Sequence, residues 1–225
     1  MALSPRTSPS SNNPDLLVCY AVREEIGPQV ARSRLAHVLV TGIGRRNASR
    51  SIQSELASQR YRLVLTCGFA GGLNPTLKLG SVIFSDDSEP PLSDSLVQLG
   101  ARVGGFYCAN RIAVTAAEKD SLWRSHAADA VEMESSIIRA VCKEKGIPSA
   151  TIRVILDAAE EDLPLDFNAL MTSDQKISIP KLALALLKSP GKVPRLLELQ
   201  RNTRVAAQRL ADVLRKSLQT LEQIN

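Results

Sequence analysis

The order in which short apolar runs and helical patterns follow one another is the feature that most constrains the fold of this chain. Apolar runs at 15–21, 37–44, 62–73, 104–114 and 150–157 are typical of strands, and amphipathic segments such as 134–146 separate them. Apolar strands that alternate with helices are typical of parallel sheets covered on both faces. The sequence therefore predicts a three-layer α/β/α fold around a mixed, mostly parallel sheet, with a C-terminal helical extension.

The length and composition predict one folding unit. A chain of 225 residues with 44% apolar residues can bury one sizeable core. We therefore expect a single domain over 15–225, preceded at 1–14 by a disordered leader rich in Ser and Pro. Within this domain, 176–225 is predicted to be a helical tail with one apolar face and one basic face.

Positive charge is concentrated in this tail. The formal net charge of the chain is +5, yet 176–216 contains ten Lys and Arg residues against Glu198 and Asp212. Such a surface can bind an anionic membrane or a nucleic acid, or it can simply be a solvated helix face. Eight aromatic residues and no recognition motif argue against nucleic acid. Peripheral membrane contact through the basic helices stays open beside the solvated face.

The cysteines and the hydropathy pattern predict the setting of the protein. Each cysteine lies alone in an apolar run, without the paired spacing of a zinc site, so we expect reduced thiols, no metal and no organic cofactor. No run approaches the roughly 18 to 20 apolar residues of a membrane span, and the N-terminus has no hydrophobic signal core. We expect a cytoplasmic protein, with association to the inner membrane as an alternative.

Glycines and acidic residues gather at the ends of the predicted strands. TGIGRRNA at 41–48 and CGFAGGLNP at 67–75 are glycine-rich turns, whose amides can approach an anion or a sugar closely. Neither is the GxGxxG fingerprint or a phosphate-binding P-loop. Two other strands end in carboxylates, at 132–134 and at Asp157. Open α/β folds bind small molecules at this edge of the sheet.

Taken in chain order, these blocks resemble a known superfamily. AVREEI, TGIG, GFAGGLNPTLKLGSVIFSD, AVEMES and VILDAAEE are similar to the nucleoside phosphorylases and nucleosidases over about 15–170. Within that superfamily, GIGRRNA, the stretch from Ala113 to AVEMES and the tail KISIPKLALALLKSPGKVPRLLELQRNTRVAAQRL resemble a branch tied to hopanoid lipid biosynthesis. The resemblance implies cofactor-free hydrolysis of the N-glycosidic bond of a 5′-substituted purine nucleoside, here adenosylhopane, by a homodimer.

The resemblance also implies two catalytic carboxylates. Asp157 matches the residue that donates a proton toward purine N7, a task that requires a partly desolvated site to keep the carboxyl group protonated. A helix N-cap is the alternative role for Asp157. Glu25 matches the residue that orients or deprotonates the attacking water, and Glu24 competes with it for this role.

Three neighbouring residues are implied to bind the ribose. Glu134 matches the carboxylate that accepts hydrogen bonds from the 2′ and 3′ hydroxyls, since a carboxylate is a bidentate acceptor. Met133 is implied to pack on the sugar face, with a core methionine as the alternative. Glu132 reaches the sugar as well or serves only as a charge at the strand end.

The residues of the nucleophile pocket indicate whether water or phosphate attacks the sugar. Thr66 stands where phosphorylases of the superfamily have an arginine and is like the nucleosidases, whereas Phe69 departs from both patterns. Arg45 and Arg46 suit a phosphate in geometry, or lie on the surface. Hydrolysis is favoured, with phosphorolysis to a ribose 1-phosphate and non-catalytic nucleoside binding as alternatives. The predicted pocket comprises Gly44, Arg45, Thr66, Gly68, Phe69, Ala70 and Gly71.

Two further departures concern the substrate. Leu156 replaces the small hydroxyl residue that is common before the catalytic aspartate, and the stretch between Asp87 and Gly104 is short. A short stretch there predicts a reduced lid and a pocket with room for a bulky 5′ substituent.

Overall fold

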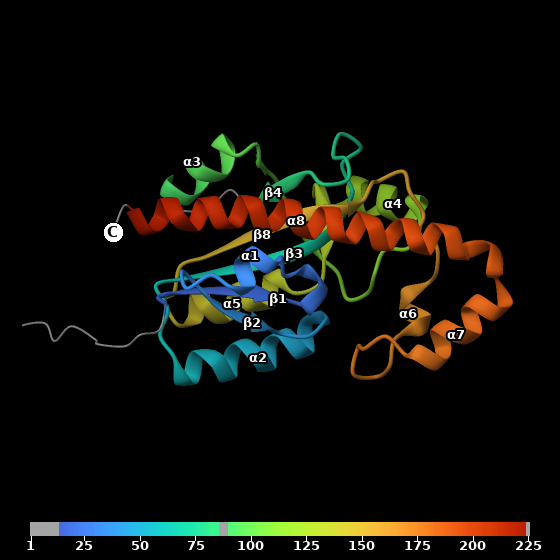
Figure 1. The fold of residues 1–225 in the computed structure, drawn as a ribbon, viewed down its shortest axis with the longest axis horizontal. Coiled ribbons are helices and arrows are strands. Elements are labelled where there is room, and N and C mark those ends of the chain that lie inside the picture. Colours follow the sequence, from blue (N-terminus) through green and yellow to red (C-terminus); the bar gives the residue numbers. More distant parts are fainter. Residues whose placement is uncertain (1–13, 86–89, 224–225) are drawn as a thin grey trace, which may run out of the picture.

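The computed structural model describes residues 14–85 and 90–223, and it places one central sheet between two layers of helices (Figure 1). Apart from Pro14, the predicted leader lies outside these residues. The eight-stranded sheet has the order β2 (His37–Val40), β1 (Leu16–Tyr20), β3 (Leu63–Gly72), β8 (Ser149–Asp157), β4 (Val82–Phe84) and β5 (Arg102–Val103). From the end of β3 it branches to β7 (Ala130–Glu132) and β6 (Phe106–Cys108).

Most neighbouring strands run parallel. β1 is parallel to β2 and β3, and β3 is parallel to β8. The exceptions are β4, which is antiparallel to β8, and β7, which is antiparallel to the end of β3. The prediction of a three-layer fold with a mixed, mostly parallel sheet is therefore confirmed.

Alternate side chains of β1 face opposite layers, as the pleat of a strand requires. Leu17 and Cys19 pack toward α2 (Gly44–Ser58) and α5 (Ser135–Glu144). Val18 and its neighbours at alternate positions pack instead toward α3 (Pro90–Gln98) and α8 (Val193–Gln223). The short α1 (Pro28–Ala31) also contributes to that second layer.

The last helix combines a buried half with an exposed half. From Ala206 onward α8 crosses one face of the sheet, and Leu210, Leu214 and Leu218 are fully buried there. Its first turns extend past the end of the sheet, where α6 (Phe167–Leu170), α7 (Ile179–Lys188) and the short 3-10 helix η2 (Pro190–Lys192) also lie (Figure 1). The predicted apolar spacing thus serves the core only in the second half of the tail.

Two segments differ from the sequence-based expectation. Only β6 forms within the strand predicted at 104–114, because the backbone N–H and C=O of Ile112 pair with the Asn168 side chain, both at 2.9 Å, instead of with a strand. The stretch expected to be merely a short lid contains the helix α3, which packs on α8. α4 (Ala116–His126) follows the loop after β6, with Thr115 as its N-cap.

All four cysteines are free, and three of them are buried. None of the helices within 14–85 and 90–223 is long and apolar enough to cross a membrane.

Candidate active site

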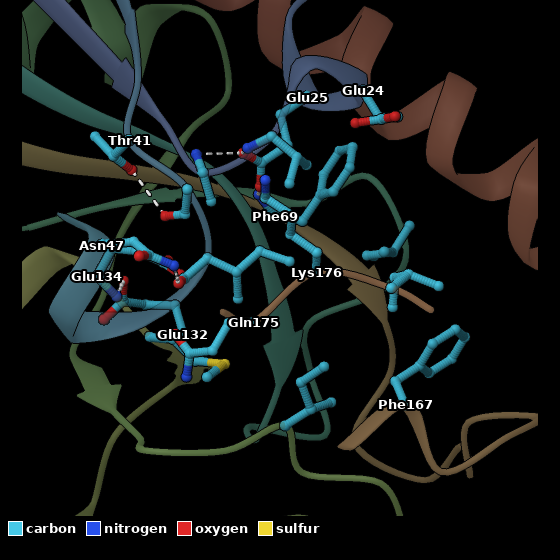
Figure 2. Close-up of a pocket in the computed structure, with 18 of the residues that line it drawn as sticks. Glu24, Glu25, Thr41, Asn47, Phe69, Glu132, Glu134, Phe167, Gln175 and Lys176 are labelled. Carbon is cyan, nitrogen blue, oxygen red and sulfur yellow. Dashed lines mark hydrogen bonds between the residues drawn. The ribbon is translucent and has the colours of Figure 1, made fainter. Parts of the chain in front are cut away.

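The carboxyl ends of β1, β3 and β8 and the start of α5 face one cavity of about 1560 Å³ (Figure 2). Figure 2 shows Glu25 and Phe69 at one end, Glu134 at another, and Phe167 on the opposite wall. The cavity therefore lies at the sheet edge where parallel α/β folds hold ligands. The predicted site residues that line it are Glu25, Phe69, Ala70, Gly71, Glu132, Met133, Glu134 and Asp157.

Glu25 ends the 3-10 turn η1 (Arg23–Glu25), which follows β1 directly. Its Oε2 accepts hydrogen bonds from the backbone N–H groups of Ala21 at 2.8 Å and Val22 at 3.1 Å. Its Oε1 accepts a third, from the N–H of Phe69 at 2.8 Å. These bonds fix the carboxylate between β1 and β3, with its side chain buried.

Gly68 allows this carboxylate to approach Arg153. The glycine has a φ of +144°, and a Cβ at this position would overlap Glu25 Oε1 and lie only 2.6 Å from Arg153 Nη1. Burial raises the pKa of Glu25, and the nearby Arg153 opposes that rise. Glu24, the competing candidate, is exposed. Of the two glutamates, Glu25 therefore has the buried and electrostatically coupled position.

Arg153 is a buried cation in the middle of β8, with 1% of its side chain exposed. Its Nη2 lies 2.6 Å from Glu132 Oε2 and 3.6 Å from Glu134 Oε2, and its Nη1 donates to the carbonyl of Cys67 at 2.7 Å. A buried guanidinium is stable only when acceptors of this kind surround it. Arg153 thus joins the three glutamates of the site into one network.

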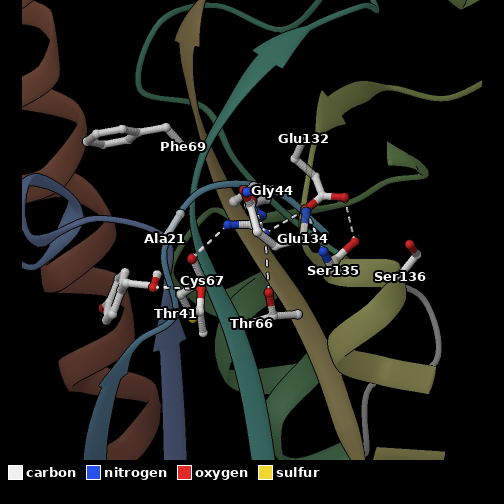
Figure 3. Close-up of polar contacts among 12 residues, drawn as sticks. Ala21, Thr41, Gly44, Thr66, Cys67, Phe69, Glu132, Glu134, Ser135 and Ser136 are labelled. Carbon is white, nitrogen blue, oxygen red and sulfur yellow. Dashed lines mark hydrogen bonds and ion pairs between the residues drawn. The ribbon is translucent and has the colours of Figure 1, made fainter. Parts of the chain in front are cut away.

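Glu132 is fully engaged by the protein. Its Oε2 also accepts from the backbone N–H of Ser135 at 2.7 Å, and its Oε1 accepts from the Ser135 hydroxyl at 2.7 Å (Figure 3). Although burial opposes it, the Arg153 guanidinium and the bonds from Ser135 hold the pKa of Glu132 below its usual value. Glu132 therefore anchors Arg153 and the start of α5, and its contact with the ribose stays a prediction beside the alternative of a charge at the strand end.

Glu134 belongs to the same network and lines the cavity. Its Oε1 accepts from the backbone N–H of Gly44, at the start of α2, at 2.7 Å (Figure 3). Burial raises the pKa of Glu134 to about 7, Arg153 opposes this rise and Glu132 reinforces it. Met133, which lies between these two glutamates in the sequence, is buried and lines the cavity.

Asp157 ends β8 and contacts a lysine that the sequence analysis did not single out. Its Oδ2 forms an ion pair with Lys119 Nζ, and 0% of the Lys119 side chain is exposed. The same Nζ donates to the carbonyls of Ala158 and Glu161, both at 2.8 Å, so all three of its protons are used. Burial raises the pKa of Asp157, and Lys119 opposes this rise.

The remaining predicted pocket residues do not line the cavity. Arg45 directs its guanidinium away from it and donates to the Ser136 hydroxyl at 2.9 Å. Thr66 is buried beneath the site, where its hydroxyl accepts from Arg153 at 3.2 Å. Arg46 and Arg50, on the first turns of α2, do line the cavity, as do Arg23 and Arg111. Arg45 is exposed in this structure, in line with the surface alternative, and its contact with phosphate stays a prediction.

The distal part of the cavity comes from the segment that follows β8. The pairing of Asn168 with Ile112 fixes α6 beside the cavity, and Asn47 Nδ2 holds the next loop by donating to the carbonyl of Asp174 at 3.1 Å. Beside Gly44 this loop places Gln175, a residue with a φ of +57°. The apolar residues of this wall are Leu163, Phe167, Ile177, Leu182, Leu196 and Leu199.

No group of three or more His, Cys, Asp or Glu side chains in the described part of the chain is arranged to hold a metal ion.

The raised pKa of Glu134 predicts a pH-dependent stability. Because the folded value of about 7 exceeds the unfolded value, the protonated form stabilises the fold, and this contribution, about 3 kcal/mol, is lost as the pH rises from about 4.5 to above 7. In thermal unfolding experiments, we expect the variant Glu134→Gln to lose less stability than the wild type over that pH range. Glu144→Gln, an exposed change on α5, is the control; equal pH dependence in all three proteins would contradict the prediction.

Comparison with known proteins agrees with this geometry. The family model described as Phosphorylase superfamily matches residues 92–188. A 5′-methylthioadenosine/S-adenosylhomocysteine nucleosidase of Geobacillus thermodenitrificans is 26% identical over 206 residues, which covers 73% of this chain and 87% of that protein.

Solved structures share the fold at lower identity. A 5′-methylthioadenosine/S-adenosylhomocysteine nucleosidase of Colwellia psychrerythraea, in complex with adenine, has a TM-score of 0.67 at 14% identity, over 92% of this chain and 95% of that one. Futalosine hydrolase of Helicobacter pylori has a TM-score of 0.62 at 16% identity, over 89% and 97%. In sequence over these regions, and in fold over most of its length, the chain is therefore similar to the phosphorylases and nucleosidases.

Proposed function

We propose that this protein hydrolyses the N-glycosidic bond of a 5′-substituted adenosine and releases adenine. The observation that carries the proposal is the set of buried carboxylates, Glu25, Glu134 and Asp157, that line one cavity at the end of the sheet. The homologous nucleosidase and the solved nucleosidases of the same fold support this reaction class.

The first task of the site is to bind the ribose as it becomes cationic. Cleavage of the bond passes through an oxocarbenium-like sugar, as in other glycosidic bond cleavage. Glu134, as a carboxylate, accepts hydrogen bonds from the sugar hydroxyls and places negative charge close to that cation. Arg153 and the Gly44 N–H hold this carboxylate in place.

The second task is to protonate the leaving purine. Protonated Asp157 donates its proton to adenine N7, so adenine leaves as a neutral base and Asp157 becomes a carboxylate. Burial raises the pKa of this carboxyl group, which favours its protonated form, and the Lys119 ammonium stabilises the carboxylate that forms. Lys119 is a positioning residue in this scheme.

The third task is to supply a nucleophile, and the charges at that end of the cavity favour water. Glu25 accepts a proton from water as it attacks the anomeric carbon. The Arg153 guanidinium beside it is already paired with Glu132, so Glu25, Glu132 and Glu134 leave excess negative charge there, which disfavours phosphate. Phosphorolysis is the second candidate, because Arg46 and Arg50 line the same cavity.

The distal wall supports a large apolar 5′ substituent. Small-molecule sites usually measure about 300 to 1,000 Å³. This cavity of about 1560 Å³ is larger, and its distal wall combines apolar side chains, among them Phe167, Leu182 and Leu199, with polar side chains of the same segment. We therefore propose adenosylhopane, in which an apolar skeleton replaces the 5′ hydroxyl, as the substrate.

A charge in the distal wall is expected to change substrate preference. Leu199→Glu should raise KM at least about tenfold for 5′-alkylthioadenosines with long alkyl chains, because the carboxylate must be desolvated against them. The KM for 5′-methylthioadenosine should stay within about twofold. Leu197→Glu, an exposed change on the same helix, is the matched control. An equal rise in KM for short and long chains would contradict the assignment of this wall.

The experiment that tests the proposed function is a direct assay of adenine release. Wild-type protein is incubated with adenosylhopane and with 5′-alkylthioadenosines of increasing chain length. We expect adenine from each, with higher kcat/KM for the longer chains. Binding of these nucleosides without adenine release would show a non-catalytic nucleoside-binding protein and reject the proposal.

A further inference from the structure

We propose that residues 177–205, which comprise α7, η2 and the first turns of α8, form a docking surface for an anionic lipid bilayer. The purpose of this docking surface rests on the proposed function: it is the uptake of an apolar nucleoside from a membrane. Its chemical basis is a combination of exposed apolar side chains and unpaired positive charge beside the cavity.

The apolar side chains of this segment are exposed to an unusual degree. No residue of α7 is buried, although its sequence, IPKLALALLK, is mostly apolar. Ile179 is 70% exposed, Leu184 52% and Leu187 80%. Of the eleven large hydrophobic residues that are exposed in the described part of the chain, seven lie in this segment: Ile177, Ile179, Leu184, Leu187, Val193, Leu197 and Val205. Concentrated exposed apolar surface of this kind marks an interaction site.

The charge of the segment is almost entirely of one sign. Between 176 and 204 there are seven basic residues and a single acidic one, Glu198. None of the ion pairs formed within the described residues uses a side chain of this stretch. Helices that expose apolar side chains next to Lys and Arg bind the interface of anionic bilayers.

The docking surface is continuous with the cavity. Leu182 of α7 and Leu196 and Leu199 of α8 line the distal wall, while Leu184, Leu187 and Leu197 on the same helices are exposed. α6, α7 and the first turns of α8 lie together beyond the end of the sheet (Figure 1). A bilayer bound here lies next to the part of the cavity that is lined by apolar residues, so an apolar substituent need not cross water to enter.

The charge pattern favours a bilayer over a second copy of the chain. A two-fold contact brings the same patch of both copies together. Such a contact across 177–205 would set the cations of one copy against those of the other, with only Glu198 to offset them. Protein interfaces are depleted of lysine in their centres, whereas anionic headgroups attract it.

The experiment measures binding of the full chain to vesicles. Vesicles of phosphatidylglycerol and phosphatidylcholine in equal parts are compared with vesicles of phosphatidylcholine alone, by co-sedimentation. We expect binding to the anionic vesicles that weakens as salt is raised. The variant Leu184→Asp/Leu187→Asp should reduce the partition coefficient at least about tenfold.

Further measurements distinguish loss of vesicle binding from loss of fold or of assembly. Val97→Asp/Val103→Asp places the same exposed change on α3 and β5 and should bind as the wild type does. Both double variants should keep wild-type kcat/KM on soluble 5′-methylthioadenosine, because none of these side chains lines the cavity. Analytical ultracentrifugation should give the same mass for both variants and for the wild type.

Absence of binding to anionic vesicles, or equal binding by the two double variants, would overturn the proposal. A change from dimer to monomer in Leu184→Asp/Leu187→Asp alone would overturn it in favour of self-association. The proposed function fails separately: wild-type protein that binds vesicles but releases no adenine would refute the reaction and leave the docking surface in place.

Discussion

Replacing Arg153 with methionine is expected to abolish adenine release and to destabilise the fold by about 3–5 kcal/mol. The guanidinium is fully buried in β8 and pairs with Glu132 and Glu134. Its removal leaves these carboxylates, together with Glu25, close to one another without a cation. Chemical denaturation and the adenine-release assay measure the two effects.

One double variant distinguishes loss of fold from loss of catalysis. Arg153→Met combined with Glu132→Gln removes both members of the buried pair, so it should recover part of the stability, since replacement of a whole ion pair is often neutral. It should not recover activity, because Glu134 and Glu25 still lack their cation. A double variant that folds and retains wild-type activity would contradict the role of Arg153 in the site.

Asp157→Asn is expected to lower kcat by about 10² to 10⁴-fold, the range that one general acid contributes. The amide preserves the size of the side chain and removes the acidic proton. Lys119 keeps its two carbonyl partners, Ala158 and Glu161, so thermal unfolding should change far less than activity. The measurement is single-turnover adenine release at saturating enzyme.

Glu160→Gln is the matched control for this change. It is exposed, lies three residues further along the chain, and should leave both kcat and stability as in the wild type. Retention of more than about a tenth of the wild-type kcat in Asp157→Asn would reject Asp157 as the proton donor.

The layers of this fold, and the edge of the sheet at which the cavity lies, could be predicted from local sequence. The apolar runs of β1, β3 and β8 are long and continuous because both faces of these strands are buried, and such runs are visible in any window of sequence. Carboxylates and glycines at the strand ends follow from the same parallel arrangement. The cavity was therefore predicted at the correct edge, with Glu25, Glu134 and Asp157 on its wall.

The electrostatic network was not predicted, because it depends on contacts between distant residues. Arg153 lies 21 residues from Glu132 along the chain, and Lys119 lies 39 residues from its acceptor at Ala158. One signal was available: a lone arginine within the apolar run ATIRVILD requires a buried anion. Lys119 lies in a polar helix, AAEKDSLWRSH, where nothing in the spacing separates a buried lysine from an exposed one.

Side-chain direction decides which partners Arg45 and Glu132 have in this structure. Arg45 and Arg46 are neighbours at the start of α2, and one step along a helix turns a side chain by about a quarter of the circumference. Arg46 consequently lines the cavity while Arg45 contacts Ser136. Glu132, in AVEMES, lines the cavity and pairs with Arg153, a contact that its position at the strand end does not reveal.

Hydrolysis of a 5′-substituted adenosine is the central claim, and identification of the sugar product tests it most directly. Wild-type protein is incubated with adenosylhopane or a long-chain 5′-alkylthioadenosine, with and without inorganic phosphate, and the products are analysed by mass spectrometry. We expect adenine and a free 5′-substituted ribose in both conditions, at rates that phosphate does not raise. A sugar 1-phosphate that forms only when phosphate is present would contradict it and make Arg46 and Arg50 the phosphate ligands to examine.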